Sequence, residues 1–157
     1  MLVRITNSLL TELSGKASLL PRKRINHNFH KESSDTLQRM LNAMEPETYV
    51  QPHKHEEPDK REVFLILKGK AVVITFNEQG DISDWILLNR KTNFAVEIPG
   101  KTWHTIISLE RGTVVYEVKD GPYEPTDDKN FAAWAPSEKE PGCMEYNRKL
   151  LKQIGLA

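Results

Sequence analysis

The stretch 53–76, HKHEEPDKREVFLILKGKAVVITF, decides how the rest of this chain is interpreted. It opens with His53 and His55, separated by one residue. Successive side chains of a strand point to opposite faces, so these two imidazoles share a face, about 7 Å apart. Glu62 follows in the same stretch, and His104 comes later. Because imidazole and carboxylate groups bind Zn, Fe, Mn or Ni, we expect these four residues to hold one divalent transition metal ion.

Each of these ligands has an alternative interpretation. The two histidines of the first motif can be solvated side chains on an edge strand, and His104 can be a hydrogen-bonded core histidine. Glu56 and Glu57 are nearer to His55 than Glu62 is, although they fall in a predicted loop. The identity of the metal stays open, because the same donors serve several ions.

Short predicted strands continue from this stretch toward the C-terminus. Residues 62–67 and 70–76 are rich in Val, Ile and Phe, with Gly69 between them. Further strands are predicted over 82–88, 94–98, 103–109 and 113–118, the last two as a hairpin across 110–112. About seven strands with no helices between them favour an antiparallel sandwich or barrel.

Both flanks of this region carry predicted helices. Residues 7–13 form an amphipathic pattern that Gly15 is expected to end. Apolar residues recur at helical spacing over 37–44, after N-cap candidates in 33–35 and before Pro46, which predicts a second helix. A terminal helix is predicted over 144–154. We therefore divide a single domain into 1–46 (helix, strand and helix), 47–120 (barrel core) and 121–157 (proline-rich extension and helix).

Polar side chains mark two further candidate sites. Residues 22–30 alternate as a strand with one polar face, made of Arg24, Asn26, Asn28 and His30. If this face lines the mouth of the barrel it can bind an anionic or sugar substrate, and if it faces solvent it has no such role. Lys119 and Tyr123 follow the last predicted strand, where a catalytic base or a substrate-orienting group can sit.

Composition limits the partners and the compartment. The 157 residues include 22 basic and 22 acidic side chains, so no net charge favours nucleic acid or an anionic membrane. Cys143 is the single cysteine, which excludes an intrachain disulfide and suits a reducing compartment. No apolar run reaches membrane-span length, and the first twenty or so residues lack a signal-peptide core. We expect a cytoplasmic protein that binds a small molecule.

The spacing of these motifs resembles the two conserved motifs of the cupin superfamily. The first is His53-x-His55 with Glu62 and Gly69, and the second is Pro99-Gly100-Lys101-Thr102-Trp103-His104. The resemblance implies a mainly β, single-domain double-stranded β-helix (a jelly-roll barrel) with the metal inside, and a homodimer. The chain departs from the pattern in its longer gap before Glu62, in Lys101 for the usual glycine and in Ser108 for a common asparagine.

A closer resemblance covers most of the chain. The runs QRMLNAMEP (38–46), TYV (48–50), EVKDGPY (117–123), DKNFA (128–132) and WAP (134–136) are similar to the WbuC family of cupin-fold metalloproteins. That family tolerates the long gap between the histidines and Glu62. Its members are often encoded among genes for O-antigen or other surface-polysaccharide synthesis, which implies a sugar or nucleotide sugar as the substrate.

Three functions are compatible with such a site. A metal that acts as a Lewis acid can support isomerisation or epimerisation of a sugar while a side chain moves a proton. Fe(II) can hold a substrate and O₂ together, as in a dioxygenase. The third function is a non-catalytic, metal-dependent binding or sensor protein, because a fold does not determine a function. The gene context of the similar family favours the carbohydrate-related enzyme.

Overall fold

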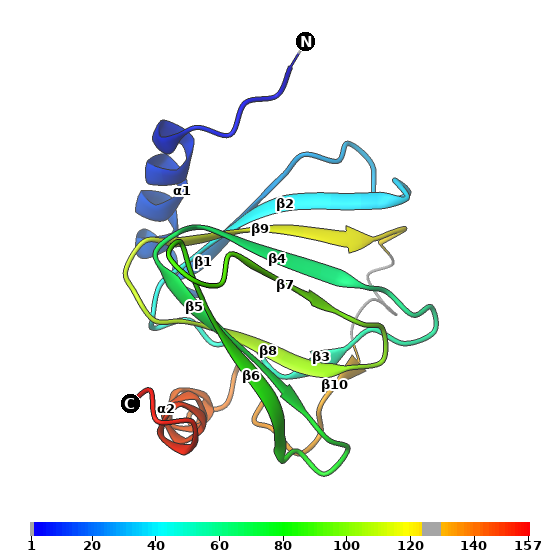
Figure 1. Cartoon of the computed structure of the whole chain (residues 1–157), viewed down its shortest axis with the longest axis vertical. Helices are drawn as coiled ribbons and strands as arrows, with labels where there is room; N and C mark the ends of the chain where they lie inside the picture. The colour runs from blue at the N-terminus through cyan, green and yellow to red at the C-terminus, as the bar shows by residue number, and fades with distance from the viewer. Residues whose placement is uncertain (1, 124–129) are drawn as a thin grey trace.

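The computed structural model describes residues 2–123 and 130–157, which form two antiparallel sheets and two helices. The first sheet has the order β1 (Arg24–Asn28), β2 (Leu37–Met44), β9 (Thr113–Asp120), β4 (Glu62–Lys68) and β7 (Ala95–Ile98). The second has the order β10 (Asn130–Phe131), β3 (His53–Lys54), β8 (Trp103–Ser108), β5 (Lys70–Phe76) and β6 (Ile82–Asn89). The sheets face each other (Figure 1), and this confirms the predicted jelly-roll fold.

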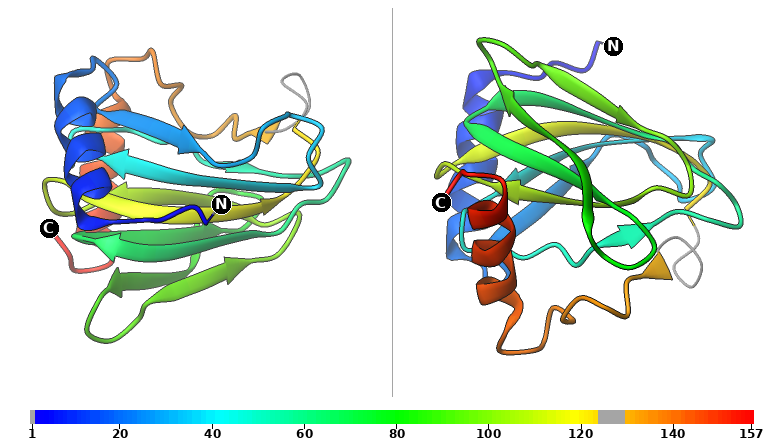
Figure 2. Two further views of the ribbon diagram at one scale, coloured as in Figure 1. Left: turned by 90° about the horizontal axis from the view of Figure 1, so that it is seen from above. Right: turned by 60° about the horizontal axis from the view of Figure 1, so that its bottom comes forward.

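The helices cover the outer faces of the two sheets (Figure 2). α1 (Asn7–Leu19) packs Leu10 and Leu13 against Leu41 of β2 in one apolar cluster. α2 (Cys143–Gln153) packs Leu150 against the outer side of β5 in a second cluster. Among the described residues, neither helix has the length and apolarity that crossing a membrane requires.

The space between the sheets is apolar at one end and polar at the other. Ile66 and Phe64 of β4 belong to the core cluster between the sheets, together with Met44, Val73, Leu88, Ile106 and Val115. Glu62, two residues before Phe64, is buried on the same face because alternate residues of a strand point the same way. The inner face therefore changes from apolar to charged along a single strand, and the charged end is where the candidate site lies.

Gly69 connects the two sheets in one residue. It separates β4 from β5, which lie in different sheets, and its φ is +75°. A Cβ atom at this position would lie 2.4 Å from Oγ1 and 2.9 Å from Cα of Thr113. Only glycine fits both the left-handed backbone and this close approach.

The helix predicted over 37–44 is wrong, because this segment is β2, paired with β1 and β9. Leu41 and Ala43 face α1 on the outside, whereas Met40 and Met44 face the interior. A strand buried on both faces is apolar without a period of two, so its spacing can imitate that of a helix. The first helix is also longer than predicted, since α1 runs through Gly15 to Leu19.

The hairpin predicted across 110–112 is also wrong. β8 pairs with β3 and β5 in the second sheet, whereas β9 pairs with β2 and β4 in the first. Residues 110–112 therefore cross between sheets, as Gly69 does. The terminal helix is present as α2, while Asp128 and Lys129 of the WbuC-like run lie outside the described residues.

We predict that Gly69→Ala lowers the free energy of unfolding by at least about 1–3 kcal/mol, the cost of a left-handed non-glycine residue. Gly15→Ala is the matched control, because no atom lies within 4 Å of its added Cβ and the site is helical. It should raise stability by about 1 kcal/mol. Urea denaturation measures the free energy of unfolding of both variants. Equal stability of Gly69→Ala and wild type would contradict the requirement for glycine between β4 and β5.

Candidate metal centre and its cavity

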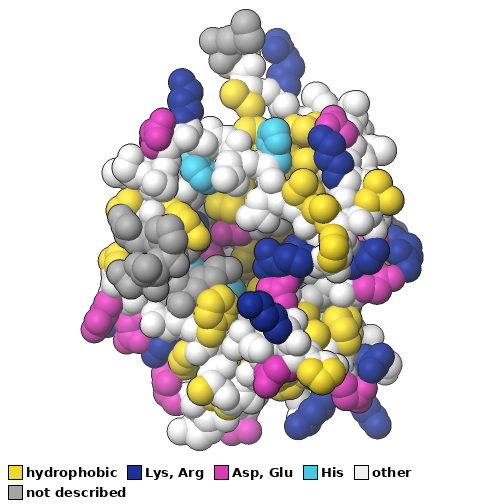
Figure 3. All heavy atoms as spheres, turned by 180° about the vertical axis from the view of Figure 1, so that it is seen from behind, with side chains coloured by type: hydrophobic (Ala, Val, Ile, Leu, Met, Phe, Trp, Pro, Cys, Tyr) yellow, Lys and Arg dark blue, Asp and Glu magenta, His cyan; other side chains and the backbone are white. Residues whose placement is uncertain are grey.

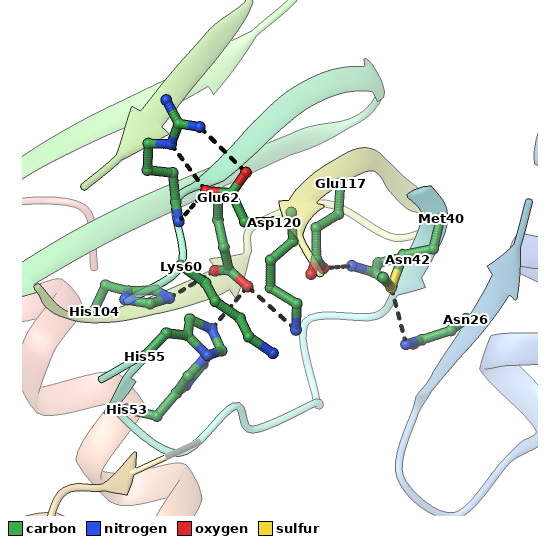
Figure 4. Close-up of polar contacts among 12 residues, drawn as sticks. Asn26, Met40, Asn42, His53, His55, Lys60, Glu62, His104, Glu117 and Asp120 are labelled. Carbon is green, nitrogen blue, oxygen red and sulfur yellow. Dashed lines mark hydrogen bonds and ion pairs between the residues drawn. The ribbon is translucent and has the colours of Figure 1, made fainter. Parts of the chain in front are cut away.

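Four buried side chains meet at the polar end of the barrel: His53, His55, Glu62 and His104. One potential ligand atom from each lies within 4.8 Å of the others (Figure 4). His53 is in β3 and is the direct cross-strand partner of His104 in β8, whereas Glu62 begins β4 in the opposite sheet. The group therefore bridges the two sheets.

Glu62 is the centre of this group. Its Oε1 lies 2.9 Å from Nε2 of His55, and its Oε2 lies 2.9 Å from Nε2 of His104. Burial raises the pKa of this carboxyl group, but the hydrogen bonds and charges of His104 and His55 outweigh burial and hold the pKa well below its ordinary value. Glu62 is therefore a carboxylate in the folded protein, as a metal ligand must be.

Two of the imidazoles are oriented by backbone carbonyls. Nδ1 of His53 donates to the carbonyl oxygen of Gln51 (2.9 Å), and Nδ1 of His104 donates to that of Thr102 (2.8 Å). In each case the acceptor is two residues earlier in the chain. A proton on Nδ1 leaves the lone pair on Nε2 for a metal, which is the usual second-shell arrangement of a ligating histidine.

The hydrogen-bond partners of His104 show that these four side chains suit a bound cation. Both ring nitrogens of His104 face acceptors, Thr102 and Glu62, yet a neutral imidazole has only one N–H. A cation between Nε2 and the carboxylate would let His104 stay neutral. Three imidazoles and one carboxylate form a donor set for a divalent transition metal.

The competing acidic residues do not reach this group. Oε2 of Glu56 pairs with Nζ of Lys54 at 2.7 Å, and Glu57 is exposed. Both lie in the loop between β3 and β4 that the sequence predicted. Of the three candidates, the structure places only Glu62 among the histidines.

A cavity of about 480 Å³ opens onto the cluster, and its lining includes His53, Glu62 and His104. The polar face of β1 lines the same cavity, with Arg24, Asn26, Asn28 and His30. The face therefore lies at the open mouth of the cavity, where Asn26 and Asn28 are also exposed to solvent. Lys119 and Tyr123 line it too, with Nζ of Lys119 3.9 Å from Oε1 of Glu62.

Several of these side chains already have protein partners. Nη1 of Arg24 donates to Oγ1 of Thr48 and to the carbonyl oxygen of Tyr49, and Nη2 pairs with Glu138 at 2.9 Å. Burial lowers the pKa of Arg24, and the hydrogen bond that Arg24 donates to Glu138 opposes that shift. Nδ1 of His30 contacts the backbone of Arg39. Arg24 and His30 therefore shape the cavity wall, whereas Asn26 and Asn28 are better placed to meet a ligand.

Sequence reasoning missed the contribution of two other strands to the cavity. Gln38, Met40 and Asn42 of β2 and Glu117 of β9 line it. The alternation of 38, 40 and 42 was a usable signal, but the helical spacing of the apolar residues hid it. Lys60, buried beside the group in Figure 4, donates to the carbonyl oxygen of Pro122, and nothing in the sequence distinguished it.

Charge on the surface is mixed. On the face shown in Figure 3, basic and acidic side chains are interspersed rather than gathered into one patch of a single sign. This agrees with the equal numbers of basic and acidic residues in the sequence.

We predict that Glu62→Gln weakens the binding of Zn²⁺ by 10-fold or more, because a neutral amide replaces the one anionic ligand. Glu57→Gln is the matched control and should bind as wild type does, since Glu57 is exposed. Titration against a chromophoric chelator measures both affinities. Equal affinities of the two variants would exclude Glu62 from the metal's ligands.

A second prediction concerns Glu138, which ties the C-terminal extension to β1. Hydrogen bonds from Arg22, together with those from Arg24, lower the pKa of Glu138 from 4.5 to about 2. A carboxyl group whose pKa is lowered by folding stabilises the folded protein at any pH above its ordinary pKa. This stabilisation is lost as the pH falls through the lowered pKa of the folded state. Glu138→Gln should therefore lower Tm at pH 7, and the deficit should shrink from pH 4.5 toward pH 2.

The control for this variant is Glu97→Gln, on the exposed edge strand β7. Scanning calorimetry at several pH values measures the difference in Tm from wild type. A deficit for Glu138→Gln that stays constant across this range would refute the assigned ion pairs.

Comparison with known proteins places this site in a recognised fold. CapF from Staphylococcus aureus, a capsular polysaccharide assembling protein, superposes with a TM-score of 0.57 and 22% identity over 78% of this chain and 34% of its own. An L-ribose isomerase from Cellulomonas parahominis superposes with a TM-score of 0.54 and 16% identity over 70% of this chain and 69% of its own. A cupin superfamily protein from Desulfitobacterium hafniense superposes with a TM-score of 0.50 and 19% identity over 66% of this chain and 85% of its own.

These likenesses establish the fold alone. This chain spans about a third of the length of the CapF chain that it matches. No protein with a curated description matches the sequence. Residues 5–88 match the family described as a domain of unknown function, DUF6016, over more than half of the chain. The chain therefore belongs to the DUF6016 family, and its fold is that of the cupins.

Proposed function

We propose that this protein is a metal-dependent enzyme that isomerises or epimerises a sugar during the synthesis of surface polysaccharide. The observation that carries the proposal is the position of Lys119. The Lys119 side chain is only 4% exposed, and its Nζ lies 3.9 Å from Oε1 of Glu62. Both residues line the cavity beside the candidate metal centre. A group that can carry a proton therefore sits beside a group that can hold a metal.

His53, His55, Glu62 and His104 would hold a divalent transition metal, whose identity the donor set leaves open between Zn, Fe, Mn and Ni. When bound, such an ion supplies Lewis-acid chemistry, which polarises a carbonyl or hydroxyl oxygen of the substrate. These four donors would leave the remaining coordination positions of the ion to oxygens of the substrate.

Lys119 is the residue that we assign to proton transfer. Isomerisation moves a proton between neighbouring carbons, and epimerisation returns it to the opposite face of the same carbon. A lysine amine can act as a general acid or base, so Lys119 would take the proton from the substrate at Nζ and return it. The ring of Tyr123 lies 5.7 Å from Nζ of Lys119 and limits where the amine can move. We assign Tyr123 to orienting the substrate.

The apolar wall beside the cluster supports this chemistry. Phe64 and Ile106 line the cavity next to Glu62 and His104, and both belong to the buried core. Apolar walls limit the access of water to a reactive intermediate and strengthen electrostatic interactions inside the site.

Two likenesses support the sugar as the substrate. The resemblance to the WbuC family and the CapF-like fold both point toward polysaccharide synthesis. The fold neighbour that is an L-ribose isomerase supplies a practical first substrate. Because the likeness is one of fold, L-ribose serves here as the first member of a panel of neutral aldoses.

We predict that the metal-loaded protein catalyses deuterium exchange from D₂O into the carbon next to the carbonyl of at least one aldose in this panel. Lys119→Met should reduce the exchange rate by about 10²–10⁴-fold, the usual contribution of a positioned acid or base. NMR measures the exchange, with metal content checked in each variant. Lys91→Met, on an exposed turn, is the matched control and should retain the wild-type rate.

Two outcomes would overturn the proposal. Oxygen uptake with an oxidised product would identify a dioxygenase instead. Tight binding of a sugar, with no exchange at any carbon, would identify a binding or sensor protein.

A further inference from the structure

Phe131 of β10 is an exposed aromatic residue on the wall of the cavity beside the metal cluster. The residue is 55% exposed, although a phenyl ring gains free energy when it leaves water. Single exposed apolar residues are common on protein surfaces, so exposure alone is not evidence of a function. Among the exposed large apolar residues that the structure describes, however, only Phe131 and Tyr123 line this cavity, and both are aromatic.

Strand pairing directs the Phe131 side chain toward the candidate metal centre. Phe131 is the cross-strand partner of His53, and directly paired residues project from the same face of a sheet. Because His53 lines the cavity, Phe131 projects to the cavity side as well. The centroids of the two rings are 6.2 Å apart. A ligand bound at the metal cluster would therefore meet the phenyl ring.

The backbone on both sides of Phe131 is held in place beside β3 (Figure 1). The N–H of Ala132 donates to the carbonyl oxygen of Pro52 at 2.9 Å, and Ala132 is buried. On the other side, Nδ2 of Asn130 donates to the carbonyl oxygen of Glu56 at 3.2 Å. The exposed ring thus stands on a fixed segment of chain. A group that is already positioned pays a smaller entropic cost when a ligand covers it.

Tyr123 places a second aromatic ring on the cavity wall, from the other sheet. It follows β9 of the first sheet, whereas Phe131 belongs to the second. Its N–H donates to the carbonyl oxygen of Ser33 at 2.7 Å, so its backbone is held too. The Nζ atom of Lys119 lies over the Tyr123 ring, which leaves Phe131 as the ring without an assigned role.

A phenyl ring restricts what a ligand can present to it. It has neither a donor nor an acceptor group, and the partial negative charge on its face attracts polarised C–H groups. A closed sugar ring presents several C–H groups together on one face, while its hydroxyl groups stay free at the edge. An open-chain sugar rotates about each C–C bond and loses that freedom if it is flattened against a ring. Phe131 therefore favours a sugar in its closed form.

We infer that Phe131 is a binding platform for the C–H face of a sugar ring, and that this site takes up the ring form of its sugar. The inference rests on the proposed function for the sugar as the ligand, and it adds which form of the sugar is recognised. The cavity volume of about 480 Å³ is within the range of small-molecule sites.

Binding of ring-locked probes tests this platform. The probes are methyl pyranosides and methyl furanosides, which cannot open, each compared with the alditol of the same sugar, which cannot close. Calorimetry on the Zn²⁺-loaded protein should show at least one methyl glycoside that binds more tightly than its alditol. Phe131→Ala should weaken that glycoside about 10-fold, because the burial of half a phenyl ring is lost. It should also remove most of the preference over the alditol.

Phe94→Ala is the matched control, because Phe94 is also 55% exposed and is not a lining residue of this cavity. It should bind both probes as wild type does. Phe131→Trp keeps an aromatic face at the same position and should retain the affinity for the glycoside. Elemental analysis checks that every variant keeps the zinc content of wild type, so that a weaker affinity reports on the platform rather than on the neighbouring His53.

Equal affinity of Phe131→Ala and wild type for the glycoside would overturn the inference, as would no binding of any methyl glycoside. Binding of uridine in place of every glycoside, and its loss in Phe131→Ala, would also overturn it, because the platform would then serve a nucleobase. Ring-selective binding that depends on Phe131, without deuterium exchange, would support the platform while contradicting the proposed enzyme. Exchange without any ring preference would do the reverse.

Discussion

The structure depends on one buried carboxylate, that of Glu62. A carboxylate removed from water must be compensated by partners, or it will take up a proton. Here the partners are two imidazoles and one ammonium group, from His55, His104 and Lys119. They come from three different segments of the chain, on both sheets. The same interaction therefore holds the sheets together at the open end and gathers the donors of the candidate metal centre.

Strand register extends this arrangement into a cavity. Lys119 is the cross-strand partner of Glu62, and Gln38 is the partner of Lys119, so one row of the sheet is polar from β4 to β2. In the next rows Glu117 pairs with Phe64 and Asn42 pairs with Val115, so these polar side chains lie beside the apolar core. Glu62 and the proposed proton carrier Lys119 thus share one row of a single sheet, and His53 and His104 face them from the other sheet. The proposed reaction needs the metal ligands and the proton carrier within one substrate's length.

The candidate site was largely predictable from the sequence, because its signals are local. The alternation of His53 and His55, and the proline-glycine turn before His104, report directly on neighbouring residues. The segment 37–44 was not predictable in this way, because burial on both faces removed the period of two from its apolar pattern. That error concealed Asn42, and with it the polar rows of the cavity. Which strands pair was also hidden, since a single residue, Gly69, carries the chain from one sheet to the other.

The central claim is that one transition metal ion is held by the histidines around Glu62. Elemental analysis of freshly purified protein tests it most directly, for the wild type and for a double variant, His53→Ala with His104→Ala. The account predicts one ion per chain in the wild type and none in the variant, with circular dichroism showing that the variant's sheets persist. A folded variant that retains its metal at full stoichiometry would contradict the account.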